Sequence, residues 1–159
     1  MALYFFDTSA LVKRYVAEVG TNWVQAITDP QAQHKIYIAE ITGVEVMAAI
    51  ARRVLTKSIA KADATTAIAK FRHDFTNQYR VFELTGNTIP DAMNLTENHQ
   101  LRAYDAMQLA IALEIDSQPK AQNMVVVGVP ALTIISADDE LNTAATAEGL
   151  IIENPRNYP

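Results

Sequence analysis

Short continuous runs of apolar residues alternate along this chain with longer stretches in which apolar residues recur at helical spacing. The short runs are typical of strands buried on both faces, and the longer stretches are typical of helices that bury one face. The alternation predicts an α/β fold around a mainly parallel sheet. Strands are expected at residues 3–6, 35–39, 80–84, 132–135 and 150–152.

Helices are expected between these strands. Ser9 can open the first helix, and Gly20 can end it in a left-handed conformation. Ser58 can cap a long alanine-rich helix that extends through Phe71. Further helices are expected at residues 23–27, 42–55, 87–98, 101–115 and 138–148.

The 159 residues contain no linker, repeat or low-complexity run, so residues 1–159 are expected to form a single domain. Segment 117–130 is loop-like, and residues 124–127 within it could form one more strand. The chain has no cysteine, which excludes disulfide frameworks, thiolate zinc sites, iron–sulfur clusters and cysteine nucleophiles. It also lacks a basic, apolar leader and any run of the roughly 18 to 20 apolar residues that span a bilayer. We therefore expect a cytoplasmic protein that does not enter a membrane.

The chain has 13 Lys and Arg against 18 Asp and Glu, a formal net charge of −5. Taken alone, this charge argues against a nucleic-acid binder, because such proteins are usually basic. The net charge is a total over the chain, however, and does not show where the acids lie in the fold. Acids gathered at one metal site would leave the rest of the surface closer to neutral.

Sequence motifs narrow the chemistry by elimination. The chain lacks GxGxxG, GxxxxGKS/T, HExxH and GxSxG, the signatures of dinucleotide sites, P-loops, zincins and α/β-hydrolases. His34, His73 and His99 are scattered, and polar neighbours favour a solvated role for the first two. The ligands of any bound metal must then be oxygens, which favour Mg²⁺ or Mn²⁺ over Zn²⁺ or Cu²⁺.

Asp7 and Asp138 each follow an apolar strand, and open α/β sheets bind their ligands at the carboxyl ends of strands. Each also has a structural alternative. Asp7 can equally cap the next helix, and Ser136 with Asp139 can form a capping pair at the start of the last helix.

Glu45 and Asp105 lie on apolar helix faces. The segment Thr42 to Glu45 also fits a capping box, which the sequence slightly favours for Glu45. Asp105 has apolar neighbours at helical spacing, where an unpaired buried carboxylate would cost several kcal/mol. A metal, a cation such as Arg102 or a helix start at Asp105 must therefore compensate its charge.

Two acids at strand ends and two on inward helix faces could converge on one pocket. That arrangement suits a hard divalent ion, which can bind a phosphodiester, lower the pKa of a bound water and neutralise the leaving oxygen. Without a metal, neighbouring carboxylates would repel one another and raise their own pKa values.

Four segments of the chain resemble the motifs of PIN-domain ribonucleases, in the order and spacing of that family. The opening Asp-Thr-Ser-Ala-Leu-Val-Lys-Arg-Tyr is most similar to VapC-type toxins of type II toxin–antitoxin pairs. The four segments are Tyr4–Tyr15 with Asp7, Gly43–Arg53 with Glu45, Leu101–Ala110 with Asp105 and Ile135–Leu141 with Asp138.

The resemblance implies a three-layer α/β/α PIN-like fold and a Mg²⁺- or Mn²⁺-dependent endoribonuclease. It further implies a homodimer and a small antitoxin that covers the active site. Ser9 and Ser136 match polar positions that orient a carboxylate or a water. The residues that would form the catalytic and metal-binding quartet are Asp7, Glu45, Asp105 and Asp138.

Five basic residues lie within eight positions of a quartet acid and could contact RNA phosphates. For each of them alone, an ordinary solvated helix charge is the simpler interpretation. They are Lys13, Arg14, Arg52, Arg53 and Arg102.

Other classes of protein share parts of this pattern. A Mg²⁺-dependent phosphatase of the haloacid-dehalogenase type also places an Asp after its first strand, but needs a second Asp where this chain has Ser9. A receiver domain needs an Asp after its middle strand, where Thr85 and Gly86 follow here. A catalytically silent PIN-like binding module remains as an alternative, although intact acids at all four motif positions argue against it.

Overall fold

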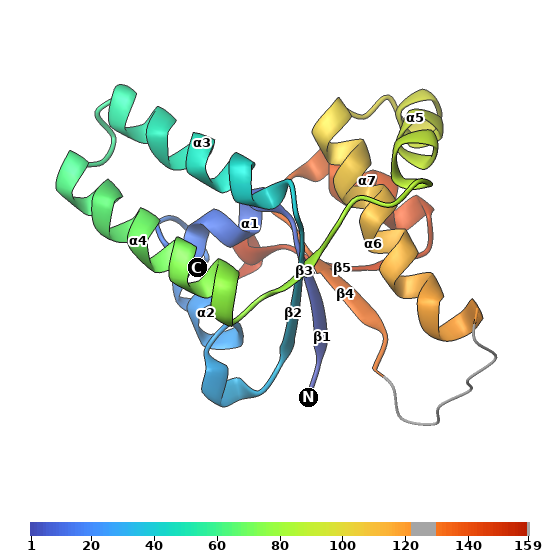
Figure 1. Ribbon diagram of the computed structural model, residues 1–159, viewed down its shortest axis with the longest axis horizontal. Coiled ribbons are helices and arrows are strands. Elements are labelled where there is room, and N and C mark those ends of the chain that lie inside the picture. Colours follow the sequence, from blue (N-terminus) through green and yellow to red (C-terminus); the bar gives the residue numbers. More distant parts are fainter. Residues whose placement is uncertain (122–129, 159) are drawn as a thin grey trace.

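A computed structural model describes residues 1–121 and 130–158, so the strand expected at residues 124–127 lies outside the described residues, as does most of segment 118–130. The described strands form one parallel sheet in the order β3-β2-β1-β4-β5 (Figure 1). The predicted mainly parallel sheet is confirmed. Its strands are β1 (Leu3–Phe6), β2 (Lys35–Ala39), β3 (Arg80–Phe82), β4 (Leu132–Ile135) and β5 (Ile151–Glu153).

Strand β1 lies at the centre of the sheet because the chain adds strands first on one side of it and then on the other. Phe5 of β1 is paired with Tyr37 of β2 on one side and with Ile134 of β4 on the other. The strand order therefore reverses at β1, and ligands of open α/β sheets bind at the carboxyl ends of the strands beside such a switch point. The residues that directly follow β1 and β4 occupy this position.

Helices cover both faces of the sheet and give three layers, with α1 to α4 on one face and α5 to α7 on the other (Figure 1). This three-layer α/β/α arrangement confirms the predicted fold class. In the described ranges, no helix is long and apolar enough to cross a membrane. The helices are α1 (Thr8–Leu11), α2 (Thr21–Ile27), α3 (Thr42–Leu55), α4 (Lys61–Asn77), α5 (Thr88–His99), α6 (Ala103–Ala121) and α7 (Asp139–Ala147).

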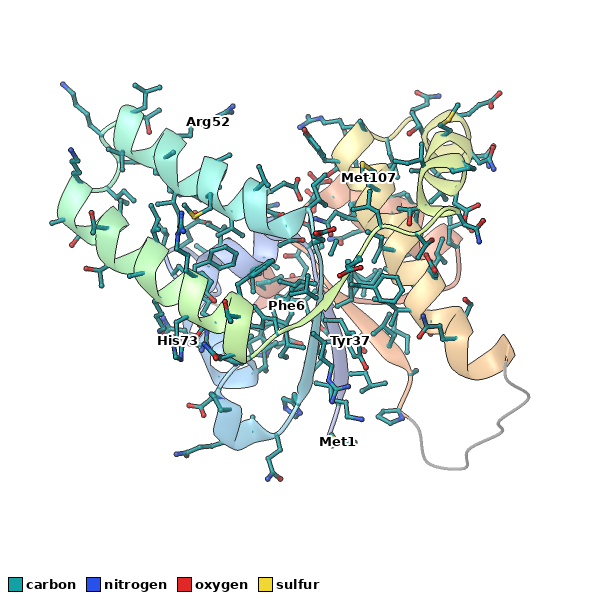
Figure 2. The ribbon with its side chains drawn as sticks, in the orientation of Figure 1. Met1, Phe6, Tyr37, Arg52, His73 and Met107 are labelled. Atoms are coloured by element: carbon teal, nitrogen blue, oxygen red, sulfur yellow. The ribbon has the colours of Figure 1, made fainter. Side chains whose placement is uncertain are left out.

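The strands divide the core into two halves. Phe5 and Ile134 pack on the side of α5 to α7, whereas Phe6 and Ile135 pack on the side of α1 to α4, and none of the four is more than 1% exposed. Successive side chains of a strand point to opposite faces, so a strand covered on both faces needs a continuous apolar run. Figure 2 shows this division at Phe6 and Tyr37, which lie on opposite sides of the sheet.

Two expected helix caps are wrong. Helix α1 gives way to the 3₁₀ turn Val12–Arg14 well before Gly20, which instead precedes α2 with a φ of 90°. A Cβ at Gly20 would lie 2.3 Å from the carbonyl oxygen of Pro155, so the close approach of the C-terminal segment requires glycine there. Ser58 does not cap α4, because the N-cap residue of that helix is Ala60.

Candidate active site

Asp7 stands at the carboxyl end of β1 and is only 3% exposed. Three donors reach its Oδ2: the Ser9 amide at 3.0 Å, the Ser9 hydroxyl at 2.5 Å and the Ser136 hydroxyl at 3.3 Å. These donors orient the carboxylate through Oδ2. Burial raises the pKa of Asp7, and the hydrogen bonds from Ser9 oppose that rise because they stabilise the charged form.

The two serines tie the ends of β1 and β4 together. The Ser9 hydroxyl accepts a 2.9 Å hydrogen bond from the backbone amide of Ala137, and the Ser136 hydroxyl accepts a 3.1 Å bond from the amide of Asp138. Ser136 is completely buried. Both serines therefore hold the segment that carries Asp138 in place beside Asp7.

Asp138 is the N-cap of α7, and its Oδ1 accepts a 2.9 Å hydrogen bond from the amide of Leu141. The expected capping pair of Ser136 with Asp139 is wrong, because Ser136 bonds to Asp138 and Asp7 instead. Asp7 likewise caps α1. The two interpretations of these strand-end acids are compatible, since each carboxylate caps a helix through one oxygen.

Glu45 lies in the first turn of α3, where the predicted capping box does not form. Helix α3 follows Ile41, which makes no side-chain cap. The carboxylate of Glu45 instead accepts two hydrogen bonds on Oε2, from the Thr8 hydroxyl at 2.8 Å and from the Gln108 amide nitrogen at 2.6 Å. Burial raises the pKa of Glu45, and these two donors oppose the rise. Within the described residues, Oε1 receives no hydrogen bond.

Gln108 is a site residue that the sequence analysis missed. It lies in α6, is 1% exposed and donates to Thr42 at 2.9 Å as well as to Glu45. The available signal was a lone amide in the apolar run Ala-Met-Gln-Leu-Ala-Ile, three residues after Asp105. A buried amide needs hydrogen-bond partners, so its position in that run indicated a polar contact inside the fold.

Asp105 lies in the first turn of α6 and is half-buried. Its pKa is raised to about 6, first by burial and then by the charges of Asp7, Asp138 and Glu45, against a lowering by Arg102. These contributions bring the other three acids within electrostatic range of Asp105. Figure 2 shows side-chain oxygens in the region where α3 and α6 begin, above the carboxyl ends of the strands.

The oxygen ligands and charge of this acidic quartet suit Mg²⁺ or Mn²⁺, but the carboxylates do not form a ready-made cage. Among residues 1–121 and 130–158, no three side chains of His, Asp or Glu are close enough to hold a metal ion. The charges of the other three acids contribute to the raised pKa of Asp105, and one oxygen each of Asp7, Glu45 and Asp138 accepts hydrogen bonds from the protein. A divalent cation bound there would offset that repulsion.

The family model for the PIN domain matches residues 4–146, which include all four acids. The chain belongs to the PIN-domain family. The predicted resemblance is thereby confirmed.

Curated relatives of this PIN domain include ribonucleases VapC45 and VapC49 from two strains of Mycobacterium tuberculosis, CDC 1551 / Oshkosh and ATCC 25618 / H37Rv. Each is 30% identical to it over 149 residues, which cover 94% of this chain and 93% of the relative. Among solved structures, VapBC2 from Rickettsia felis bound to a promoter DNA fragment has a TM-score of 0.58 and 14% identity, over 96% of this chain and 98% of the other. That structural likeness supports the fold.

Arg14 of this PIN domain, one of the residues expected to contact RNA phosphates, is only 8% exposed. Its side chain is buried and forms an ion pair with Asp74 at 3.0 Å. It also donates to the backbone carbonyl and the hydroxyl of Thr28, at 3.0 and 2.5 Å, and to Gln78 at 3.1 Å. The Arg14 guanidinium therefore donates its hydrogen bonds to partners within the fold.

The other four basic residues of this PIN domain differ in their availability. Lys13 is buried and bonds to Glu18 at 2.9 Å, and Arg53 pairs with the other oxygen of the same carboxylate. Burial lowers the pKa of Lys13, as do the nearby charges of Arg156 and Arg53. Arg52 and Arg102 are exposed, and Arg52 points outward from α3 (Figure 2). In the part of the chain that the structure describes, neither Arg52 nor Arg102 forms an ion pair.

Proposed function

We propose that this PIN domain is a metal-dependent endoribonuclease that hydrolyses RNA phosphodiester bonds, with Asp7, Glu45, Asp105 and Asp138 holding one or two Mg²⁺ or Mn²⁺ ions. The observation that supports the proposal is the position of Asp7 and Asp138 after the neighbouring strands β1 and β4 at the switch point of the sheet, with Glu45 bonded to Thr8, the residue that follows Asp7. Two Mg²⁺ ions would bring the formal net charge from −5 to −5 + 4 = −1. The acidic composition is then consistent with an RNA substrate.

The bound metal would supply an activated water and neutralise charge on the leaving oxygen. The chain's own residues orient the ligands. Ser9 and Ser136 hold Oδ2 of Asp7, and Thr8 and Gln108 hold Oε2 of Glu45. These hydrogen bonds orient both carboxylates through one oxygen, and the other oxygen of each would bind the cation.

RNA phosphates would contact Arg102 and Arg52, the exposed members of the basic set. The charge of Arg102 lowers the pKa of Asp105, so Arg102 lies near enough to this acid to neutralise a neighbouring phosphate. Lys13 and Arg53 would contact RNA only by releasing Glu18.

The biological role that fits these features is the toxin of a toxin–antitoxin pair, acting as a homodimer on cytoplasmic RNA. Its support is the similarity to ribonucleases VapC45 and VapC49 and the fold shared with VapBC2. A cognate antitoxin would restrain cleavage by covering the site.

Cleavage of structured RNA by the purified protein tests the enzymatic proposal. We expect cleavage with Mg²⁺ or Mn²⁺, loss of cleavage in EDTA and loss in Asp7→Asn. The matched control is Asp63→Asn, the same change on the exposed face of α4, which should cleave like the wild type. Cleavage that persists in EDTA or in Asp7→Asn would overturn the proposal.

A catalytically silent binding module is the second candidate, favoured by the lack of a ready-made metal cage in the described residues. Titration calorimetry separates it from the nuclease. Binding of Mn²⁺ supports the nuclease, and RNA binding with no Mn²⁺ binding supports the module.

A further inference from the structure

Gln108 carries a buried amide in the middle of α6, on the side of the helix that faces α3. Its nitrogen donates to Oε2 of Glu45 at 2.6 Å and to the hydroxyl of Thr42 at 2.9 Å, and lies 3.5 Å from the hydroxyl of Thr8. Among the described residues, the side-chain hydrogen bonds of Gln108 therefore lead to Glu45, Thr42 and Thr8.

The orientation of the Gln108 amide follows from these partners. A flipped amide would place its oxygen against the carboxylate of Glu45, where two acceptors repel each other. The hydroxyl of Thr42 lies 2.9 Å from the amide nitrogen and 3.4 Å from the amide oxygen, and because a hydroxyl can donate or accept, the carboxylate of Glu45 decides the orientation. Thr42 is itself completely buried and holds the amide in place without contacting the carboxylate oxygens.

We infer that Gln108 is a positioning residue for the proposed metal site: its amide holds Glu45 through Oε2 so that Oε1 is presented to the cation. This inference rests on the proposed function. Gln108 in α6 and Thr8 at the start of α1 both donate to the same carboxylate oxygen of Glu45. Two donors on one oxygen restrict rotation of the carboxylate, so the side chain loses less conformational freedom when a cation binds.

Gln108→Met tests this role, because methionine keeps the length and unbranched shape of glutamine and removes its donor. We expect the affinity for Mn²⁺, measured by calorimetry without RNA, to fall by about 10- to 100-fold. The matched control is Gln31→Met, the same change in the exposed turn Pro30–Ala32 at the opposite end of the sheet, which should bind Mn²⁺ like the wild type. Unchanged Mn²⁺ affinity in Gln108→Met would overturn the inference.

A double-mutant cycle with Glu45→Ala separates positioning from a general packing effect. If Gln108 acts through Glu45, Gln108→Met has no further effect on Mn²⁺ affinity once the carboxylate is removed, whereas additive losses would contradict the inference. Should Gln108→Met fail to fold, Thr42→Val decides, because it removes the hydroxyl that accepts from the Gln108 amide nitrogen and leaves Glu45 in place; a loss of Mn²⁺ affinity supports the inference and an unchanged affinity overturns it. A wild-type protein that neither binds Mn²⁺ nor cleaves RNA would instead refute the proposed function.

Discussion

The hydroxyl of Thr8 donates a 2.8 Å hydrogen bond to Oε2 of Glu45, a residue 37 positions further along the chain. Thr8 directly follows Asp7, so this bond fixes the end of β1 to the first turn of α3. It also gives Glu45 a partner in the site, which is why the local capping box does not form. Two of the four carboxylates are thereby held relative to each other before any cation binds.

Addition of Mn²⁺ should stabilise the protein against heat, because a cation that binds the folded quartet offsets the repulsion among its carboxylates. At a free Mn²⁺ concentration about 100 times the dissociation constant, the expected gain in free energy of unfolding is about 2.7 kcal/mol. Thermal unfolding with and without Mn²⁺ measures it. The gain should be lost in Asp105→Asn and kept in Asp63→Asn; an equal gain in both variants would point to Mn²⁺ binding elsewhere.

Asp7→Asn should raise the thermal stability of the metal-free protein while it abolishes cleavage. Burial and the charge of Asp138 disfavour the ionised form of Asp7, and an amide of the same shape removes both penalties. An increase in Tm of about 2–4 °C is the expected size for a gain near 1 kcal/mol. Calorimetry of the metal-free protein checks it. A lower Tm would mean that the hydrogen bonds from Ser9 to the carboxylate outweigh its burial.

The stability of the metal-free protein should depend on pH through Asp105. Its pKa is raised to about 6 in the folded state, above the value of about 3.9 for an unfolded chain. The folded state therefore binds more protons between these values, so this group favours folding below about pH 4 and loses that contribution as pH rises through about 6.

Thermal unfolding of the wild type and Asp105→Asn from pH 4 to 7 isolates that effect. The two proteins should differ least near pH 4, and the asparagine variant should become progressively more stable relative to the wild type as pH rises toward 7. A difference independent of pH would mean that Asp105 titrates below this range.

Most of the fold could be predicted because its signals are local and repeated. Continuous apolar runs located the strands β1, β2 and β4 to the residue, and the position of acids after β1 and β4 followed from the same pattern. The first helix was predicted too long, since the break into the 3₁₀ turn Val12–Arg14 depends on contacts that helical spacing does not encode.

The parts of the site that could not be predicted depend on partners distant in sequence. A glutamate at position 45 fits both a local capping box and a carboxylate of the site. Its hydrogen bonds with Thr8 and Gln108 decide between these two roles, and both partners are distant in sequence. Arg14 lies within the first motif, seven positions after Asp7, but its side chain pairs with Asp74, 60 positions away. Sequence distance from a motif is therefore a poor guide to which way a side chain points.

Loss of the Arg14 guanidinium should destabilise the fold and leave the metal site intact. Arg14→Met removes the cation from a buried pair with Asp74, and an uncompensated buried charge typically costs about 3–5 kcal/mol. Urea denaturation measures the loss, and Mn²⁺ affinity of the folded fraction should equal that of the wild type. The double variant Arg14→Met with Asp74→Leu should recover part of the stability; no recovery would indicate that Thr28 and Gln78, rather than Asp74, are the partners that matter.

Arg102→Gln should weaken RNA binding in a way that depends on salt. Arg102 is exposed, and its charge lowers the pKa of Asp105 at the start of α6. A lysine or arginine that neutralises one phosphate contributes a slope of about one to the dependence of log affinity on log salt, so its removal should reduce the slope by about that amount. Binding of RNA to a cleavage-deficient Asp7→Asn background, over a series of salt concentrations, provides the measurement. Lys57→Gln, at an exposed position beyond the end of α3, serves as the control. If both variants reduce the slope equally, RNA binding depends on overall charge and not on the position of Arg102 beside the quartet.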